Sequence, residues 1–175
     1  MIISKRKNYM ALNSNSIAFT GLAHEYCNAV ENAREYEQGD FVRTMLKLLP
    51  RLYISATDLA VDDDYHFDAY IDAALEEDYY DAVRRGMEQL FGPDDVYLEV
   101  FEEDMKFSDT PVSASIAEGL ADIFQVLYNF LATVRDTTDE TVSLALASVS
   151  DDFKAYWSST LCNVLRALNA IAVRE

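Results

Sequence analysis

The chain has 175 residues, with 31 acidic side chains against 14 basic ones and a net charge of −17. That charge repels phosphate backbones and anionic headgroups, so it argues against direct binding to nucleic acid or to an anionic membrane. No stretch approaches the roughly 18 uncharged apolar residues of a membrane span, and residues 1–9 precede no secretory-type apolar run, so we expect a cytoplasmic protein.

Only five Gly and three Pro interrupt a chain that is half hydrophobic. All-β folds need more turn residues than this, so the composition favours an all-α fold. We expect residues 1–15 to form a poorly ordered tail and residues 16–175 to form one domain, a bundle of about six helices.

The first two helices are predicted from apolar residues at three- and four-residue steps. The first should span residues 16–36, with its N-cap among residues 14–16, because Ser and Asn side chains accept orphan amide hydrogens. Asp40 can cap the second helix, whose apolar stripe reaches about Leu59. Pro50 lies inside its apolar stripe and removes one backbone donor, so we expect either a kink there or two helices.

The middle of the chain is less regular. Residues 61–76 carry repelling acids, although Phe67, Ile71 and Leu75 keep the four-residue step of a short helix. A helix over residues 78–91 should end at Gly92, before Pro93. Residues 95–105 fit a helix or a short strand, and we favour the helix because no partner strand is visible.

Two further helices complete the prediction. Thr110 and Pro111 have the residue types of an N-cap and a first helical position, which predicts a fifth helix starting there. Its polar face would carry Glu118, Asp122, Gln125 and Asn129. A capping box from Thr137 to Glu140 should open the last helix, which runs to about Ile171 unless residues 150–151 divide it.

Most of the charge lies in residues 58–109, which hold 18 acids and three bases, a net of −15. The remaining 13 acids and 11 bases give −2, and the two sums make −17. Five tyrosines interleave with these acids and are candidate partner-binding residues, since Tyr adds apolar contact and a hydrogen bond: Tyr65, Tyr70, Tyr79, Tyr80 and Tyr97. The segment could dock a basic or mixed-charge protein, mimic DNA, or only keep the protein dispersed.

Carboxylates four residues apart raise the question of a metal. Glu99 with Glu103, and Glu118 with Asp122, would each share a helix face, and together they could hold Mg²⁺ or Mn²⁺. That would suit a divalent-metal-dependent hydrolase acting on a phosphorylated small molecule. The alternative is that these side chains form ordinary solvated faces.

No other motif assigns chemistry. The sequence lacks a nucleophile elbow, a Gly-rich phosphate loop and metal-type His spacing, so no catalytic residue and no cofactor can be assigned. Cys27 and Cys162 fall among apolar residues and are expected to be buried free thiols, as in a reducing cytoplasm. The long apolar stripe of the last helix also allows a homo-oligomeric structural protein.

Several segments resemble one bacterial family, namely DVYLEVF (95–101), Asp109-Thr110-Pro111, SIAEGLADI (115–123) and LLPRLY (48–53). The chain resembles the uncharacterised Bacteroides-type proteins that carry domain of unknown function 5063. The resemblance covers about residues 16–172 and implies a cytoplasmic helical protein. It implies no activity and no site residue. The net charge of residues 58–109 makes a non-enzymatic acidic protein that binds a basic or mixed-charge protein partner our leading interpretation.

Overall fold

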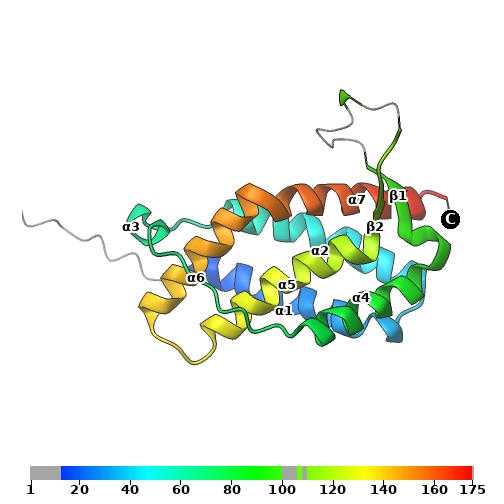
Figure 1. Ribbon diagram of the computed structural model, residues 1–175. Helices are drawn as coiled ribbons and strands as arrows, with labels where there is room; N and C mark the ends of the chain where they lie inside the picture. Colours follow the sequence, from blue (N-terminus) through cyan, green and yellow to red (C-terminus); the bar gives the residue numbers. More distant parts are fainter. Residues whose placement is uncertain (1–12, 100–105, 108–109, 175) are drawn as a thin grey trace, which may run out of the picture.

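The computed structural model describes residues 13–99, 106–107 and 110–174 (Figure 1). Helices dominate, and the described residues include one pair of short strands. In chain order the elements are α1 (Ser14–Glu31), η1 (Ala33–Glu35), α2 (Gln38–Thr57), α3 (Asp63–His66), α4 (Glu77–Phe91), η2 (Gly92–Asp95), β1 (Val96–Leu98), β2 (Ser113–Ser115), α5 (Ile116–Val134), α6 (Asp139–Asp152), η4 (Phe153–Trp157) and α7 (Ser158–Ala172). The expected all-α bundle is confirmed.

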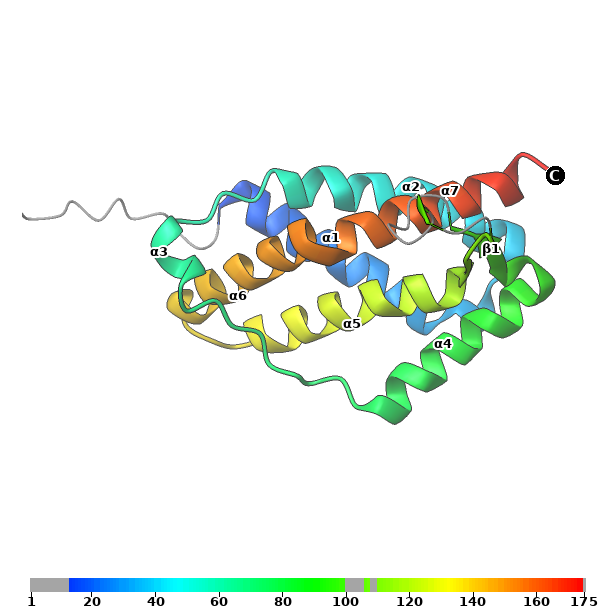
Figure 2. The ribbon, with the colours of Figure 1, turned by 45° about the horizontal axis from the view of Figure 1, so that its top comes forward.

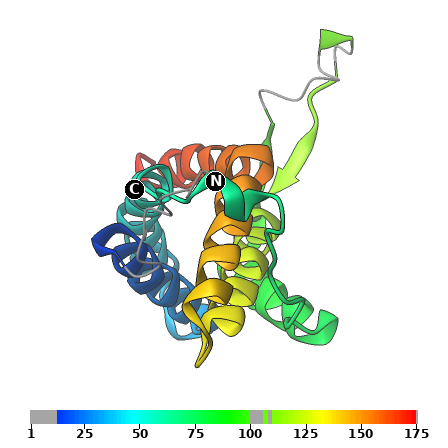
Figure 3. The same ribbon diagram turned by 90° about the vertical axis from the view of Figure 1, so that its left-hand side faces the viewer.

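The long helix α5 lies at the centre of the bundle and packs against α1, α4, α6 and α7. Its apolar stripe is fully enclosed at Leu120, Ile123 and Leu127, as the spacing predicted. Helix α2 covers α1 and α7 from the other side, and the helices surround one shared core (Figure 3). Aromatic rings from separate helices pack there: the ring centroids of Phe19 in α1 and Phe130 in α5 lie 5.4 Å apart.

The first two helices follow the prediction with shifted ends. Helix α1 begins at Ser14, because Asn13 accepts the amide hydrogens of Asn15 and Ser16, and it ends at Glu31 instead of residue 36. Helix α2 starts at Gln38, after Glu37, so Asp40 lies in its first turn and is not its cap. It runs through Pro50 as one helix, so two helices meeting there is the wrong alternative.

Helix α4 ends at Gly92 as predicted, because this residue has φ +52°, a conformation that other residues adopt at a cost. The predicted helix over residues 95–105 is wrong at its start. Residues 96–98 form β1, which pairs antiparallel with β2, Tyr97 opposite Ala114. The pair projects from the side of the bundle (Figure 1).

The predicted start of the fifth helix is also wrong. Helix α5 begins at Ile116, where the Ser115 side chain accepts the Glu118 amide hydrogen, and not at Thr110 and Pro111. Val112 and Ser113, which the prediction put in the first turn of this helix, instead pair with the chain around β1. Ser113 belongs to β2, and the Glu99 amide donates to the Val112 carbonyl at 2.8 Å, which extends the ladder.

The last predicted helix is divided, but by a π-helical turn. Helix α6 starts after Thr138, one residue later than the expected cap, and η4 joins it to α7. The extra residue of the π turn turns Phe153 and Trp157 inward, where their rings lie 4.5 Å apart. The indole N–H of Trp157 donates to the Val149 carbonyl at 3.2 Å.

No helix in the described part of the chain is both long enough and apolar enough to cross a membrane.

Candidate functional site

The most distinctive surface is the connection from α2 to α4, residues 58–76, which we call the acidic strap. It holds seven acids and no Lys or Arg. After the single helical turn of α3 it passes over α6 and α5 without regular structure until α4 begins (Figure 2). A short helix does lie within residues 61–76, but it is α3, which ends at His66 before the four-residue step of Phe67, Ile71 and Leu75 begins.

The strap is attached to the bundle by polar contacts along its length. Its first half rests on α6, where His66 Nδ1 lies 2.9 Å from Asp151 Oδ2 and the Tyr70 amide donates to the Leu144 carbonyl. Its second half rests on α5, where the Asp72 amide donates to Thr133 Oγ1 at 2.8 Å.

One α5 side chain makes a double contact with the strap. Asn129 Oδ1 accepts the amide hydrogens of Ala74 at 3.0 Å and of Leu75 at 2.8 Å. The expected polar face of the fifth helix is thus real, but Asn129 binds protein backbone instead of only facing water.

The outer side of the strap is strongly anionic and carries an exposed ring. Phe67 is 96% exposed and Tyr70 is 51% exposed. Six carboxylates are exposed in the same segment: Asp58, Asp63, Asp64, Asp68, Asp72 and Glu76. A surface of this kind attracts cations and offers one large apolar contact.

The candidate partner-binding tyrosines have a common property that the sequence did not reveal. Tyr65 is half-buried on α3, whereas the hydroxyls of the other four donate to carboxylates of this same chain. Their partners are Asp72 for Tyr70, Glu31 for Tyr79, Asp122 for Tyr80 and Glu99 for Tyr97. These four hydroxyls therefore orient carboxylates within the protein.

Asp122 receives two such phenols, and one of them was missed from the sequence. Tyr80 from α4 donates to Oδ1 and Tyr156 from the π turn donates to Oδ2, each at 2.7 Å. Burial, then the hydrogen bond and the charge of Asp122, raise the pKa of Tyr156 to about 12. The same causes raise the pKa of Tyr80 well above its usual range.

The candidate metal ligands do not form a common site in the described residues. Glu118 and Asp122 lie one turn apart on α5, whereas Glu99 follows strand β1 and is buried beside Tyr97. Glu103 lies outside the described residues. Among those described, no three His, Cys, Asp or Glu side chains are grouped to hold an ion.

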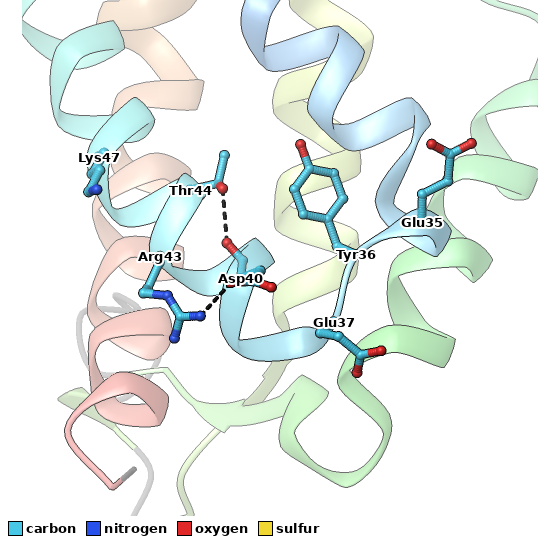
Figure 4. Close-up of a pocket in the computed structure, with 7 residues that line it drawn as sticks. All are labelled: Glu35, Tyr36, Glu37, Asp40, Arg43, Thr44 and Lys47. Carbon is cyan, nitrogen blue, oxygen red and sulfur yellow. Dashed lines mark hydrogen bonds and ion pairs between the residues drawn. The ribbon is translucent and has the colours of Figure 1, made fainter.

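A hollow of about 510 Å³ lies where η1 meets α2 (Figure 4). The Thr44 hydroxyl donates to the Asp40 carbonyl there, and Arg43 pairs with the Asp40 carboxylate. Its walls carry charges of both signs, so they give little net attraction for one kind of ion. The lining residues are Glu35, Tyr36, Glu37, Asp40, Arg43, Thr44 and Lys47.

Two further expectations concern the thiols and the last helix. Both cysteines are free, but only Cys27 is buried, because Cys162 lies on the outer side of α7 and is exposed. The apolar stripe of α7 is covered by α2 and α5 within the same chain. It is therefore not available for oligomerisation in this structure.

Comparisons with known proteins agree with this architecture. A crystal structure of protein BF1032 from Bacteroides fragilis is similar, with 28% sequence identity and a TM-score of 0.77 over 91% of this chain and 92% of that one. No match was found among curated proteins. A family model described as a domain of unknown function, DUF5063, matches residues 11–174. The chain therefore belongs to the DUF5063 family.

Proposed function

We propose that the protein is a non-enzymatic binding protein that docks a basic segment of a cytoplasmic protein partner on the acidic strap. The observation that carries the proposal is the exposed Phe67 among six exposed carboxylates, in a segment without Lys or Arg. A Lys- or Arg-rich segment with an apolar residue complements this surface in charge and in hydrophobicity.

The two kinds of contact, ion pairs and burial of the Phe67 ring, would contribute differently to binding. Exposed ion pairs contribute little each, about 0.2–1 kcal/mol, but several of them speed association and set its salt dependence. Burying a Phe ring that is otherwise in water contributes about 1.5–3 kcal/mol. The carboxylates would therefore select a basic partner, and Phe67 would retain it.

The proposal is tested by titrating a fluorescently labelled lysine-rich peptide containing one Leu. We expect the affinity to fall steeply once the ionic strength exceeds about 0.1 M, where the Debye length is about 10 Å. The variant Asp64→Asn/Asp68→Asn should bind about 3- to 20-fold more weakly. Phe67→Ala should weaken binding without changing the salt dependence.

The matched control is Glu35→Gln/Glu37→Gln, which makes the same change in net charge at exposed positions beside η1, outside the strap. If the control pair weakens the peptide as much as the strap pair does, the attraction comes from total charge and the strap is not the docking surface. A salt-insensitive or undetectable interaction would remove the proposal altogether.

A further inference from the structure

The Asn129 side chain holds two consecutive backbone amides of the strap, those of Ala74 and Leu75, on a single oxygen. Since both strap groups are donors, the carboxamide must present its oxygen to them, which fixes its orientation. One turn later, the Thr133 hydroxyl donates to the backbone carbonyl of Asn129 and accepts the backbone amide hydrogen of Asp72. Three strap amides are thus held by two neighbouring side chains.

These contacts matter because the strap makes no regular backbone ladder between residues 67 and 76. Its apolar anchors, Ile71 and Leu75, are only partly buried. Each free residue of such a segment loses conformational entropy when it is ordered on binding. A strap ordered beforehand by α5 loses less.

We propose that Asn129 is a positioning residue that orders the acidic strap in the conformation in which it meets its basic partner. The inference rests on the proposed function, because it concerns the same surface. Asn129 itself does not touch the partner. It holds the amides of Ala74 and Leu75, and Thr133 holds the amide of Asp72. Together they set the spacing between the carboxylates of Asp72 and Glu76 and the exposed ring of Phe67.

The test compares Asn129→Ala with Gln125→Ala. Gln125 is an exposed amide one turn earlier on the same helix, and no strap amide in the described residues donates to it, so its removal matches the chemical change without removing a strap hydrogen bond. We expect Asn129→Ala to bind the lysine-rich peptide about 3- to 10-fold more weakly and Gln125→Ala to bind it like the parent protein. Hydrogen exchange at the Leu75 amide should be about tenfold faster in Asn129→Ala alone, whereas the Ala74 amide also donates to the Asp72 carbonyl and should change less.

Rescue separates ordering from general damage. Asn129→Asp keeps an oxygen acceptor for both amides, and Gln125→Glu adds the same charge without the contact. Exchange at the Leu75 amide should be as slow in Asn129→Asp as in the parent protein. Asn129→Asp should bind the lysine-rich peptide as tightly as Gln125→Glu does.

The failures of the two proposals differ. If the parent protein does not bind the peptide, the proposed function fails and this inference fails with it. If the parent binds, and Asn129→Ala binds equally well despite faster exchange, the strap docks its partner without prior ordering and the positioning role is overturned. Unchanged exchange in Asn129→Ala overturns it as well.

Discussion

The carboxylate of Asp95 accepts the backbone amide hydrogen of Ala117 at 2.7 Å, from a position 22 residues earlier in the chain. Its other oxygen accepts the Ser115 hydroxyl at 2.6 Å. Asp95 is buried, lies at the end of η2, and places a negative charge at the N-terminus of the central helix α5. It therefore joins α4, the strand pair and α5 at one point.

Removing this junction should destabilise the whole bundle. We expect Asp95→Ala to lower the free energy of unfolding by about 1–3 kcal/mol, because it leaves a helix-terminal amide and a hydroxyl without their acceptor. Urea denaturation measures this. Asp94→Ala is the neighbouring control, since Asp94 pairs with exposed Arg174 and accepts one partly buried hydrogen bond from Gln38, and its loss should cost less, about 0.5–1.5 kcal/mol. Equal losses for the two variants would contradict the role assigned to Asp95.

Close packing of α5 on α7 gives a second prediction. A Cβ atom at Gly119 would lie 2.5 Å from Val164 Cγ1, so in Gly119→Ala either the Val164 side chain or the two helices must shift. We expect a loss of about 1–3 kcal/mol in the free energy of unfolding. Gly21→Ala, in α1, meets nothing within 4 Å and should be neutral or stabilise by up to about 1 kcal/mol. Thermal or chemical denaturation of both variants decides it.

The burial of Tyr156 and its hydrogen bond to Asp122 predict that the protein loses stability at alkaline pH. The folded-state pKa of Tyr156 is raised to about 12 from an ordinary value of 10.0, so its stabilisation is fully present below pH 10 and is lost as pH rises toward 12. Tyr156→Phe should lower the free energy of unfolding at pH 8 by only about 0.5 kcal/mol, because the side chain is half exposed to water. Between about pH 10 and pH 12 the free energy of unfolding of this variant should fall less than that of the parent protein.

Urea denaturation at several pH values between about 8 and 12 measures this difference. Tyr65→Phe serves as the control, since the Tyr65 hydroxyl has no hydrogen-bond partner within the described ranges. A parallel decline of the parent and Tyr156→Phe would show that Tyr156 does not contribute to the alkaline loss.

The strand pair depends on α7 through Arg166, whose guanidinium donates to the Leu98 carbonyl at 2.9 Å on the outer edge of β1. Arg166→Ala should leave that carbonyl to water and speed hydrogen exchange at the Glu99 amide, which bonds across to Val112. The bundle should keep its melting temperature within about 4 °C, because one exposed hydrogen bond is lost. Large-scale unfolding in this variant would contradict the local role.

The helices were predictable where local signals acted alone. Gly92 ended α4 because no other residue adopts its positive φ as readily, and the stripe of α5 followed from its spacing. Thr110 and Pro111 have the residue types of a helix start, yet Ser115 is the N-cap of α5. Asp95, from η2, accepts the Ala117 amide hydrogen in the first turn of this helix. A contact over 22 residues leaves no trace in local spacing.

The candidate site was predictable in composition and not in contacts. The acidic excess of residues 58–76 is plain in the sequence, whereas the hold of Asn129 on Ala74 and Leu75 is not. The π turn likewise has no sequence signal, although it carries Tyr156 to Asp122. Such pairings depend on which helices become neighbours in the bundle.

Using phenols as donors to acids has an electrostatic consequence. An Arg or Lys that binds a carboxylate cancels its charge, whereas a neutral tyrosine fixes the direction of the carboxylate and leaves the charge in place. Asp122 with Tyr80 and Tyr156, and Glu31 with Tyr79, are anchored in this way. The molecule thereby gains internal order at these acids while keeping the long-range negative potential that a distant cation would sense.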